Sequence, residues 1–275
     1  KTKRHHKTND PGSTMSERFQ DRVIFERIDR VAIISLDRPE RLNAFDAAMY
    51  EGVNEALAKF ASDPDLWVAI IQAKGDRAFS AGADVSALNE NAKKGVNAAL
   101  GGLNLDNHMV TNKPLIAAVH GFCVGEGVSL ALCCDMIIAD PKASFIISEA
   151  KVGTNAVDIP IKLAKKIGYS KAFAFLTPGD PKSADWCERA GFVEVISEVG
   201  QVQQTALDVA QRICNESGPL AIRAQKETLW RSVFEDDVKA KEVGLSMRTA
   251  IRQSSDYKEG REAFLEKRSP EFKGT

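Results

Sequence analysis

Phe79-Ser80-Ala81-Gly82-Ala83-Asp84 is the first of two glycine-containing turns that decide the fold of this chain, and the second is His120-Gly121-Phe122-Cys123-Val124-Gly125-Glu126-Gly127. Each turn follows an apolar run typical of a strand, and the second opens a segment with helical spacing. Two turns of this kind can direct backbone N–H groups at one point. Because such a point stabilises an oxygen atom that gains negative charge during a reaction, the pair predicts an oxyanion-binding site.

Composition and charge are those of an ordinary globular protein. The 275 residues, of which 44% are hydrophobic and 27% charged, suffice for one large domain or a domain with an extension. The formal net charge of −1 gives no reason to expect nucleic acid or an anionic membrane as a partner. No apolar run approaches the roughly 20 residues that span a bilayer. We therefore predict neither a nucleic-acid nor a membrane partner.

The cysteines indicate a reducing compartment. Cys123, Cys133, Cys134, Cys187 and Cys214 are odd in number and lie mostly in apolar surroundings. Cys133 and Cys134 are adjacent, whereas zinc-binding pairs are usually separated by about two to four residues. We expect buried, reduced thiols, no metal site and a cytoplasmic localisation.

The pattern divides the chain into three parts. Residues 1–14 are basic and polar, and we interpret them as a tag or a disordered leader. Residues 15–200 alternate strand-like and helix-like segments, which is typical of α/β construction. Residues 201–275 carry only helical patterns and form a predicted helical C-terminal region.

Individual elements follow from the same patterns. Short apolar runs predict strands at Val23 to Ile28, Val31 to Leu36, Trp67 to Gln72, Leu115 to Val119, Asp135 to Ala139 and Ser144 to Ile147. The first two form a predicted hairpin. Helical spacing predicts helices at Ala44 to Phe60, Glu126 to Cys134, Ile161 to Ile167, Lys171 to Leu176, Ser183 to Ala190, Gln201 to Glu216, Pro219 to Val233, Asp236 to Ile251 and Tyr257 to Arg268. The weakly periodic segment from Asn89 to Asn112 predicts a mobile helix or loop beside a site.

Five stretches, in order and at plausible spacing, resemble the crotonase family, the enoyl-CoA hydratase/isomerase superfamily. They are Val31 to Ala44, Phe79 to Asp84, Lys113 to Gly121, Leu130 to Asp135 and Gly260 to Arg268. The resemblance extends over nearly the whole chain. It implies an α/β, crotonase-like spiral of ββα repeats with a helical C-terminal region that packs in homotrimers, often paired as hexamers. It also implies an acyl-CoA thioester as the substrate, with coenzyme A as part of that substrate and no permanently bound cofactor.

By this resemblance, the oxyanion donors are the backbone N–H groups of Ala81 and Glu126. The family usually has glycine at the second position, but a backbone N–H is present with any side chain except proline. The Glu126 carboxylate is then either an extra acid in the pocket or, as we favour, a group that turns outward or caps the helix N-terminus.

Hydratases of the family use two carboxylates, and this chain matches only one of them. The first position is Ser129 and the second is Glu149. A single carboxylate suffices to move a proton between two carbon atoms, as in isomerisation. We therefore predict Glu149 as the catalytic base. For Ser129 we expect either a hydroxyl bonded to its own helix turn or a group that holds water or the substrate.

Other candidates are also implied by the resemblance. Asp158 is a further carboxylate candidate, and its alternative role is to cap the helix ahead of Pro160. His120 is expected to be structural. The expected CoA contacts are Arg41, Leu42, Ala81, Ala83, Asp84, Phe264 and Lys267. The last two are expected to come from a neighbouring subunit, unless they merely share one face of an amphipathic helix.

The leading hypothesis is a lyase or isomerase of fatty-acid or related acyl-CoA metabolism, in which Glu149 transfers a proton at a thioester enolate. Three alternatives stay open. One is an enoyl-CoA hydratase or dehydratase, and the second is a CoA-thioester hydrolase or C–C lyase that uses Asp158 or Glu126. The third is a non-catalytic acyl-CoA binder.

Overall fold

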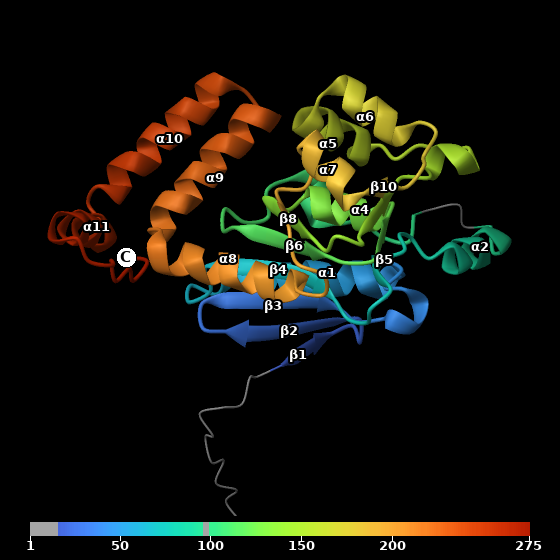
Figure 1. Cartoon of the computed structure of the whole chain (residues 1–275), viewed down its shortest axis with the longest axis horizontal. Helices are drawn as coiled ribbons and strands as arrows, with labels where there is room; N and C mark the ends of the chain where they lie inside the picture. The colour runs from blue at the N-terminus through green and yellow to red at the C-terminus, as the bar shows by residue number, and fades with distance from the viewer. Residues whose placement is uncertain (1–15, 96–98) are drawn as a thin grey trace, which may run out of the picture.

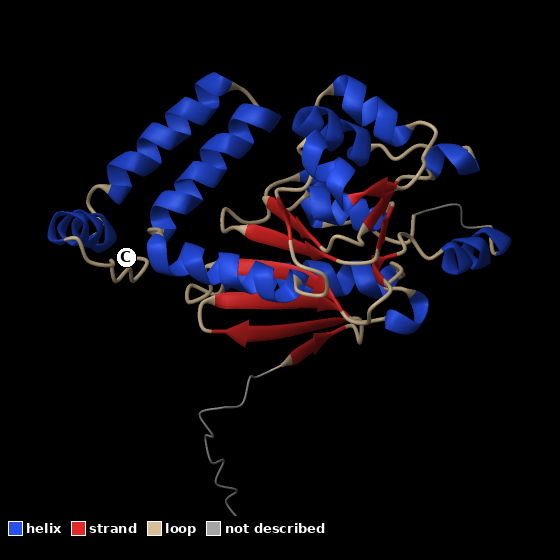
Figure 2. Ribbon diagram, viewed as in Figure 1, coloured by secondary structure: helices blue, strands red, loops and turns tan. Residues whose placement is uncertain are grey.

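A computed structural model describes residues 16–95 and 99–275 (Figure 1). The predicted leader, residues 1–14, therefore lies outside the described residues. Two β-sheets occupy the centre, and helices cover them (Figure 2). This is the α/β construction expected from the alternation of strand-like and helix-like segments.

The larger sheet has seven strands in the order β1-β2-β3-β4-β6-β8-β11. Their bounds are β1 Glu17–Phe19, β2 Val23–Ile28, β3 Val31–Leu36, β4 Val68–Ala73, β6 Leu115–Val119, β8 Met136–Ala139 and β11 Val195–Ile196. β1, β2 and β3 pair antiparallel, whereas β3 onward is parallel. Every residue of β3, β4 and β6 is buried, which explains their continuous apolar sequences.

The smaller sheet positions the two glycine-containing turns. It has the order β10-β9-β7-β5, with β5 Ala78–Ser80, β7 Phe122–Val124, β9 Ser144–Ile146 and β10 Lys182–Ser183. β5 and β7 are parallel neighbours, with Ser80 opposite Cys123. Because parallel strands end at the same edge, the turns that follow β5 and β7 emerge side by side.

Two helices sandwich the larger sheet. α1 (Ala47–Ser62) buries Met49, Val53, Leu57 and Phe60 in the main core. α8 (Val202–Glu216) buries Val202, Ala206, Ala210 and Cys214 in a second cluster, against residues of β3, β4, β6 and β8. The first helix of the C-terminal region thus packs on the sheet, while the division at residue 200 stays a prediction.

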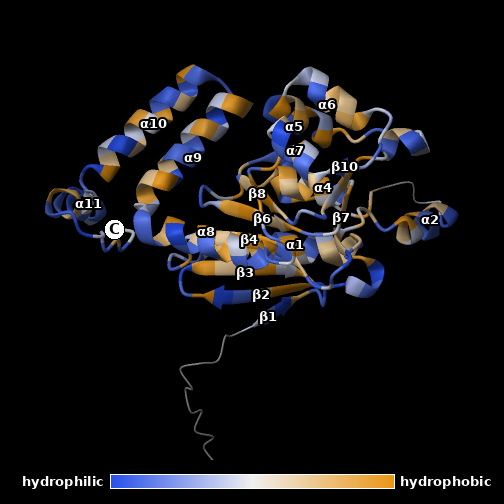
Figure 3. Ribbon diagram, in the orientation of Figure 1, coloured by the Kyte–Doolittle hydropathy of each residue, from blue (hydrophilic) through white to orange (hydrophobic). Residues whose placement is uncertain are grey.

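The remaining helices surround the smaller sheet and extend from the core. They are α2 Val85–Lys93, α3 Asn104–Asn107, α4 Glu126–Leu132, α5 Asp158–Ile167, α6 Tyr169–Leu176, α7 Ala184–Ala190, α9 Pro219–Phe234, α10 Asp237–Ile251 and α11 Ser255–Glu266, with 3-10 turns η1 Pro39–Arg41 and η2 Glu149–Val152. α9, α10 and α11 project at the opposite side of the molecule from α2 (Figure 1). Apolar and polar segments alternate along α9 and α10 (Figure 3).

Most predicted elements are present with shifted ends. The hairpin of β2 and β3 is confirmed. The first helix begins at Ala47 rather than Ala44, because the Asp46 side chain accepts a hydrogen bond from the Met49 N–H and caps it. α5 begins at Asp158 rather than Ile161, since proline is tolerated in a first helical turn and Pro160 does not delay the start.

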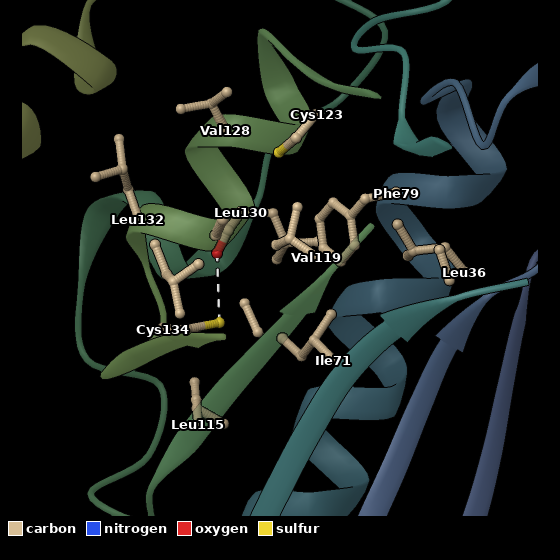
Figure 4. Close-up of a cluster of buried hydrophobic side chains, with 14 of the residues drawn as sticks. Leu36, Ile71, Phe79, Leu115, Val119, Cys123, Val128, Leu130, Leu132 and Cys134 are labelled. Atoms are coloured by element: carbon tan, nitrogen blue, oxygen red, sulfur yellow. Dashed lines mark hydrogen bonds between the residues drawn. The ribbon is translucent and has the colours of Figure 1, made fainter. Parts of the chain in front are cut away.

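A packed core lies directly beneath the two turns. Phe79 and Cys123, which belong to the two turn sequences and lie in β5 and β7, are fully buried in the same cluster as Val119 and Leu130 (Figure 4). Interiors of this kind are close-packed and resist displacement. The backbone atoms that follow Phe79 and Cys123 are therefore held by rigid structure.

A separate observation concerns the length and polarity of the helices. Within residues 16–95 and 99–275, none is both long and apolar enough to cross a bilayer.

Candidate active site

The two turns meet at their glycines. Gly82 has φ of +88°, and a Cβ added to it would lie 3.0 Å from the Val124 carbonyl oxygen and 3.7 Å from the Glu126 nitrogen. A Cβ on Gly127 would lie 2.9 Å from the Ser80 Cβ. Only residues without side chains allow this approach. The glycines thus bring two backbone segments from distant parts of the sequence into contact.

Buried polar side chains brace the first turn. The Ser80 hydroxyl donates to the Asn43 carbonyl at 2.8 Å and accepts from the Gly82 N–H at 3.1 Å. The Asn43 amide donates to the carbonyl oxygens of Lys74 and Ala78 at 3.0 and 2.9 Å. This network fixes the backbone that leads into Ala83.

The structure corrects the predicted oxyanion donor in the first turn. The Ala81 N–H donates to the Leu42 carbonyl at 2.9 Å and is therefore already engaged. By contrast, the Ala83 N–H has no acceptor among the described residues, although the N–H groups of its chain neighbours Gly82 and Asp84 are both bonded. The available donor is Ala83, and the prediction of Ala81 was wrong because it ignored the loop that carries Leu42.

The predicted second donor, the Glu126 N–H, lies at the start of a helix. Glu126 is the first residue of α4, where backbone N–H groups have no partner within the helix. Its N–H has no acceptor among the described residues. Since Gly82 lies against the Glu126 nitrogen, the N–H groups of Ala83 and Glu126 flank one small region. The helix dipole adds positive potential there.

Glu126 is half-buried and its Oε1 atom is buried, contrary to our expectation that the side chain turns outward or caps the helix. Gly125 is the N-cap residue and no side chain caps α4. The Glu126 Oε1 atom is buried without a partner among the described residues. Burial, and then the charge of Asp106, raise the pKa of this carboxyl to about 7, although contact with Tyr50 opposes the rise. The Glu126 carboxyl therefore holds its proton to a higher pH than an exposed glutamate does.

Glu149 lies against the second turn. It opens η2 after β9, and its Oε1 atom is 3.0 Å from the position of a Cβ on Gly125. That position is also 4.0 Å from the Gly82 Cα. The Glu149 Oε2 atom is buried and has no partner among the described residues. One carboxylate oxygen next to the two donors is thus available to another molecule.

Ser129 does not bond to its own helix turn, so that alternative was wrong. Its hydroxyl donates to the Asp106 Oδ1 atom at 3.0 Å. Asp106, from α3, forms an ion pair with Lys162 of α5, and only 13% and 10% of their side chains are exposed. Burial lowers the pKa of Lys162, but the contacts with Cys133 and Asp106 raise it by more, so its pKa is above the usual value. We call Asp106, Ser129 and Lys162 the Asp106 cluster.

Two further predicted site residues are the carboxylates Asp158 and Asp84. Asp158 is exposed on the first turn of α5, where Val157 is the N-cap residue, so the capping alternative was wrong. Asp84 accepts the N–H groups of Ser86 and Ala87 and pairs with Arg38 at 2.8 Å. Burial raises the pKa of Asp84, but Arg38 and the backbone bonds outweigh this effect and lower it. Its carboxylate thus has a structural role.

The expected CoA contacts fall into two groups. Arg41 and Leu42 lie at the end of η1, and Leu42 has φ of +53°, which places its carbonyl against the Ala81 N–H. Phe264 is exposed on α11 and Lys267 is the exposed residue that caps its C-terminus, and Phe264 lines an apolar cavity of about 510 Å³. No residue of the two turns lines that cavity, so a contact between these groups stays a prediction.

The remaining sequence features are structural. Burial lowers the pKa of His120, whose Nε2 atom has no partner among the described residues. All five cysteines are free, and burial raises the pKa of the Cys133 thiol to about 12. None of these thiols has the lowered pKa of a nucleophile.

Sequence reasoning missed Tyr50, Asp106 and Lys162. Tyr50 lies in a segment with the apolar spacing of an ordinary core helix, and only 5% of its surface is exposed. Lys162 sits on an amphipathic helix, and Asp106 lies in the weakly periodic segment between strands. The prediction that this segment lies beside a site was the one available signal.

The arrangement can stabilise an enolate. Two free N–H groups lie beside a buried carboxylate oxygen, and a second acid, whose pKa is raised by burial, lies at the helix start. The charged Asp106 is separated from solvent by its pairing with Lys162. These features suit a carbonyl oxygen that gains charge while a proton leaves the neighbouring carbon.

Comparison with known proteins supports this chemistry. A family model described as enoyl-CoA hydratase/isomerase matches residues 26–275. A relative named carnitinyl-CoA dehydratase from Proteus mirabilis is 35% identical over 252 residues, covering 88% of this chain and 94% of the relative. The structure resembles a probable enoyl-CoA hydratase/isomerase from Mycobacterium abscessus, with a TM-score of 0.84 and 30% identity, covering 93% of this chain and 100% of the other. An enoyl-CoA hydratase from Mycobacterium tuberculosis H37Rv has a TM-score of 0.81 and 31% identity, with 92% and 99% covered.

Proposed function

Because the chain belongs to the enoyl-CoA hydratase/isomerase family and is an acyl-CoA enzyme of the lyase/isomerase type, we propose that it moves a proton at the α-carbon of an acyl-CoA thioester. Glu149 is the base. The backbone N–H groups of Ala83 and Glu126 hold the carbonyl oxygen as it becomes an enolate.

The proposed step needs no other reactant. Glu149 takes the α-proton, and the electron pair of the broken C–H bond moves to the carbonyl oxygen. Each oxyanion donor typically contributes about 10²- to 10³-fold in rate, or roughly 3–4 kcal/mol. The proton then returns from Glu149 to carbon, and its return to a different carbon completes an isomerisation.

One observation carries this proposal. The Glu149 Oε2 atom is buried without a partner among the described residues, next to the glycines that bring the two donors together. An unpaired carboxylate oxygen is costly to bury unless a ligand completes it. Its position beside the free N–H groups matches the needs of proton abstraction next to a carbonyl.

A second candidate is hydration or dehydration of the same thioester class. The relatives named carnitinyl-CoA dehydratase favour it, and so does the buried polar group at Ser129. Hydrolysis or C–C cleavage through Asp158 is less well supported, since that carboxylate is exposed. We further propose that CoA binds near Arg41 and Leu42, and that a homotrimer or hexamer brings Phe264 and Lys267 of a neighbouring copy to the CoA phosphates.

Exchange of the α-proton tests the proposal directly. Butyryl-CoA incubated with the enzyme in D₂O should gain deuterium at the α-carbon, as measured by mass spectrometry. Glu149→Gln should reduce the exchange rate at least about 100-fold. The matched control is Glu188→Gln on exposed α7, which should exchange at the normal rate.

Other outcomes identify the alternatives. Release of free CoA without exchange would indicate a hydrolase, and tight binding without exchange would indicate a binder. Normal exchange in Glu149→Gln would show that another group is the base.

A further inference from the structure

The Asp106 cluster is not used by the proton transfer proposed above, yet it is buried next to that site. It brings together α3, α4 and α5, and its ion pair links Asp106 to Lys162. Burying such a pair has a cost, and it is retained where a specific geometry is needed. The group that this geometry controls is the Ser129 hydroxyl.

Asp106 determines which hydrogen bonds Ser129 can still make. A serine hydroxyl has one proton and two lone pairs. The proton is directed to the Asp106 Oδ1 atom at 3.0 Å, so the Ser129 oxygen can only accept from any further partner. A hydroxyl that donates to a carboxylate also becomes a stronger acceptor, because neighbouring hydrogen bonds polarise one another.

Ser129 lies one helical turn from Gly125, the residue against which Glu149 packs. The Ser129 N–H donates to the Gly125 carbonyl at 3.0 Å, which stacks Ser129 over Gly125 along α4. Glu149 lies against Gly125 itself, with its Oε1 atom 3.0 Å from the position of a Cβ. Residues one turn apart on a helix face are about 5–6 Å apart, so Ser129 and Glu149 lie beside the same stretch of α4.

We infer that Asp106 is a positioning residue that sets Ser129 as the acceptor for the β-hydroxyl group or the reacting water when the thioester is dehydrated or hydrated. This inference rests on the proposed function, since it requires Glu149 to move the α-proton. It adds that one carboxylate serves both proton transfers, while Ser129 orients the oxygen atom.

The dehydration balances with these groups alone. Glu149 takes the α-proton, and the C–H electron pair moves to the thioester oxygen. The enolate then re-forms the carbonyl as the Cα=Cβ bond forms and the Cβ–O bond breaks. The leaving hydroxide takes the proton from Glu149 and departs as water, and the Ser129 oxygen accepts its hydrogen bond throughout. Hydration follows the same path in reverse.

Two reactions of one enzyme separate the positioning role from a structural role. Dehydration of 3-hydroxybutyryl-CoA and of carnitinyl-CoA, with hydration of crotonyl-CoA, is followed by absorbance, and deuterium exchange of butyryl-CoA is followed by mass spectrometry. In Asp106→Asn/Lys162→Met, which removes the buried charges together, dehydration and hydration should fall about 10- to 100-fold. Exchange should stay within about threefold of the wild-type rate, because it needs only Glu149 and the two N–H groups.

Ser129→Ala should show the same selective loss. If Asp106 acts through Ser129, adding Asp106→Asn/Lys162→Met to Ser129→Ala should cause no further fall in the ratio of dehydration to exchange. Cys134→Ala is the control for loosened packing, because its buried sulfur bonds to the Leu130 carbonyl of α4 rather than to Asp106, and it should leave both rates unchanged.

Each contrary result has a distinct meaning. If the charge-removed variant keeps the wild-type ratio of dehydration to exchange, or if its effect adds to that of Ser129→Ala, the inference is wrong. It is also wrong if the wild type exchanges butyryl-CoA but neither hydrates nor dehydrates any of the thioesters. Failure of exchange in the wild type would instead overturn the proposed function.

Discussion

The buried carboxyl of Glu126 should make the stability of this protein fall as the pH rises. Its pKa is about 7 in the folded chain, against a usual value of 4.5, and burial is the main cause. Between pH 4.5 and about pH 7 folding takes up a proton, so protonation of Glu126 favours the folded state. This stabilisation is complete below the pKa of the unfolded chain and is lost as the pH rises through the pKa of the folded chain. The rise in pKa corresponds to about 3 kcal/mol of unfolding free energy above pH 7.

Glu126→Gln removes this titration while keeping the shape of the side chain. Urea unfolding at pH 5 and pH 8, at one protein concentration, measures the free energy of unfolding of both proteins. The free energy of unfolding of the variant minus that of the wild type should increase by about 2–3 kcal/mol from pH 5 to pH 8. Glu188→Gln, on exposed α7, should change by less than about 0.5 kcal/mol over the same range.

The prediction is wrong if the free energies of unfolding of the wild type and of Glu126→Gln depend on pH in the same way. That result would mean that the carboxyl is hydrated in the folded state, and it would remove the physical basis for a neutral acid at the start of α4.

Further predictions concern the same region. Ionisation of Glu126 places negative charge beside the enolate oxygen, so the exchange rate of butyryl-CoA should fall above pH 7, and Glu126→Gln should abolish this fall in a pH–rate profile. Gly82→Ala should reduce exchange at least about 100-fold, because its φ is +88° and a Cβ meets the Val124 carbonyl at 3.0 Å. Gly191→Ala, with φ of +87° and no atom of the described residues within 4 Å of the added Cβ, is the matched control and should keep full exchange. Asn43→Ala should lower the free energy of unfolding by about 2–3 kcal/mol in urea titrations, since two buried carbonyl oxygens lose their donor; an unchanged value would show that water replaces the amide.

The architecture was predictable from the sequence because its signals are local. β6 was predicted at its observed bounds, since an apolar run of five residues between Pro114 and His120 has no competing interpretation. The start of α1 was misplaced because its cap depends on one side chain, Asp46, rather than on the apolar period. The small sheet that joins β5 to β7 links residues far apart in sequence, and no local pattern contains that pairing.

The donor in the first turn shows why the site is harder to predict than the fold. Ala81 and Ala83 are chemically identical and lie two residues apart, so spacing cannot separate them. What distinguishes them is the carbonyl of Leu42, about forty residues earlier in the chain, which occupies the Ala81 N–H. A backbone donor is available only where no other segment supplies an acceptor, and that is a property of the tertiary structure.

The Asp106 cluster shows that the chemical role of a side chain, like the availability of a backbone donor, depends on the tertiary structure. Read along α4, Ser129 is a position without a carboxylate, and the expected consequence is the loss of water chemistry. In the folded chain the Ser129 hydroxyl donates a hydrogen bond to the carboxylate of Asp106, which forms an ion pair with Lys162 from a third segment. The character of a position therefore depends on the partner of its side chain: alone, Ser129 would be an indifferent donor and acceptor, whereas beside Asp106 it accepts only. Because Asp106 lies in a short helix within a weakly periodic segment, a substitution there would change the behaviour of Ser129 while leaving every family signature intact.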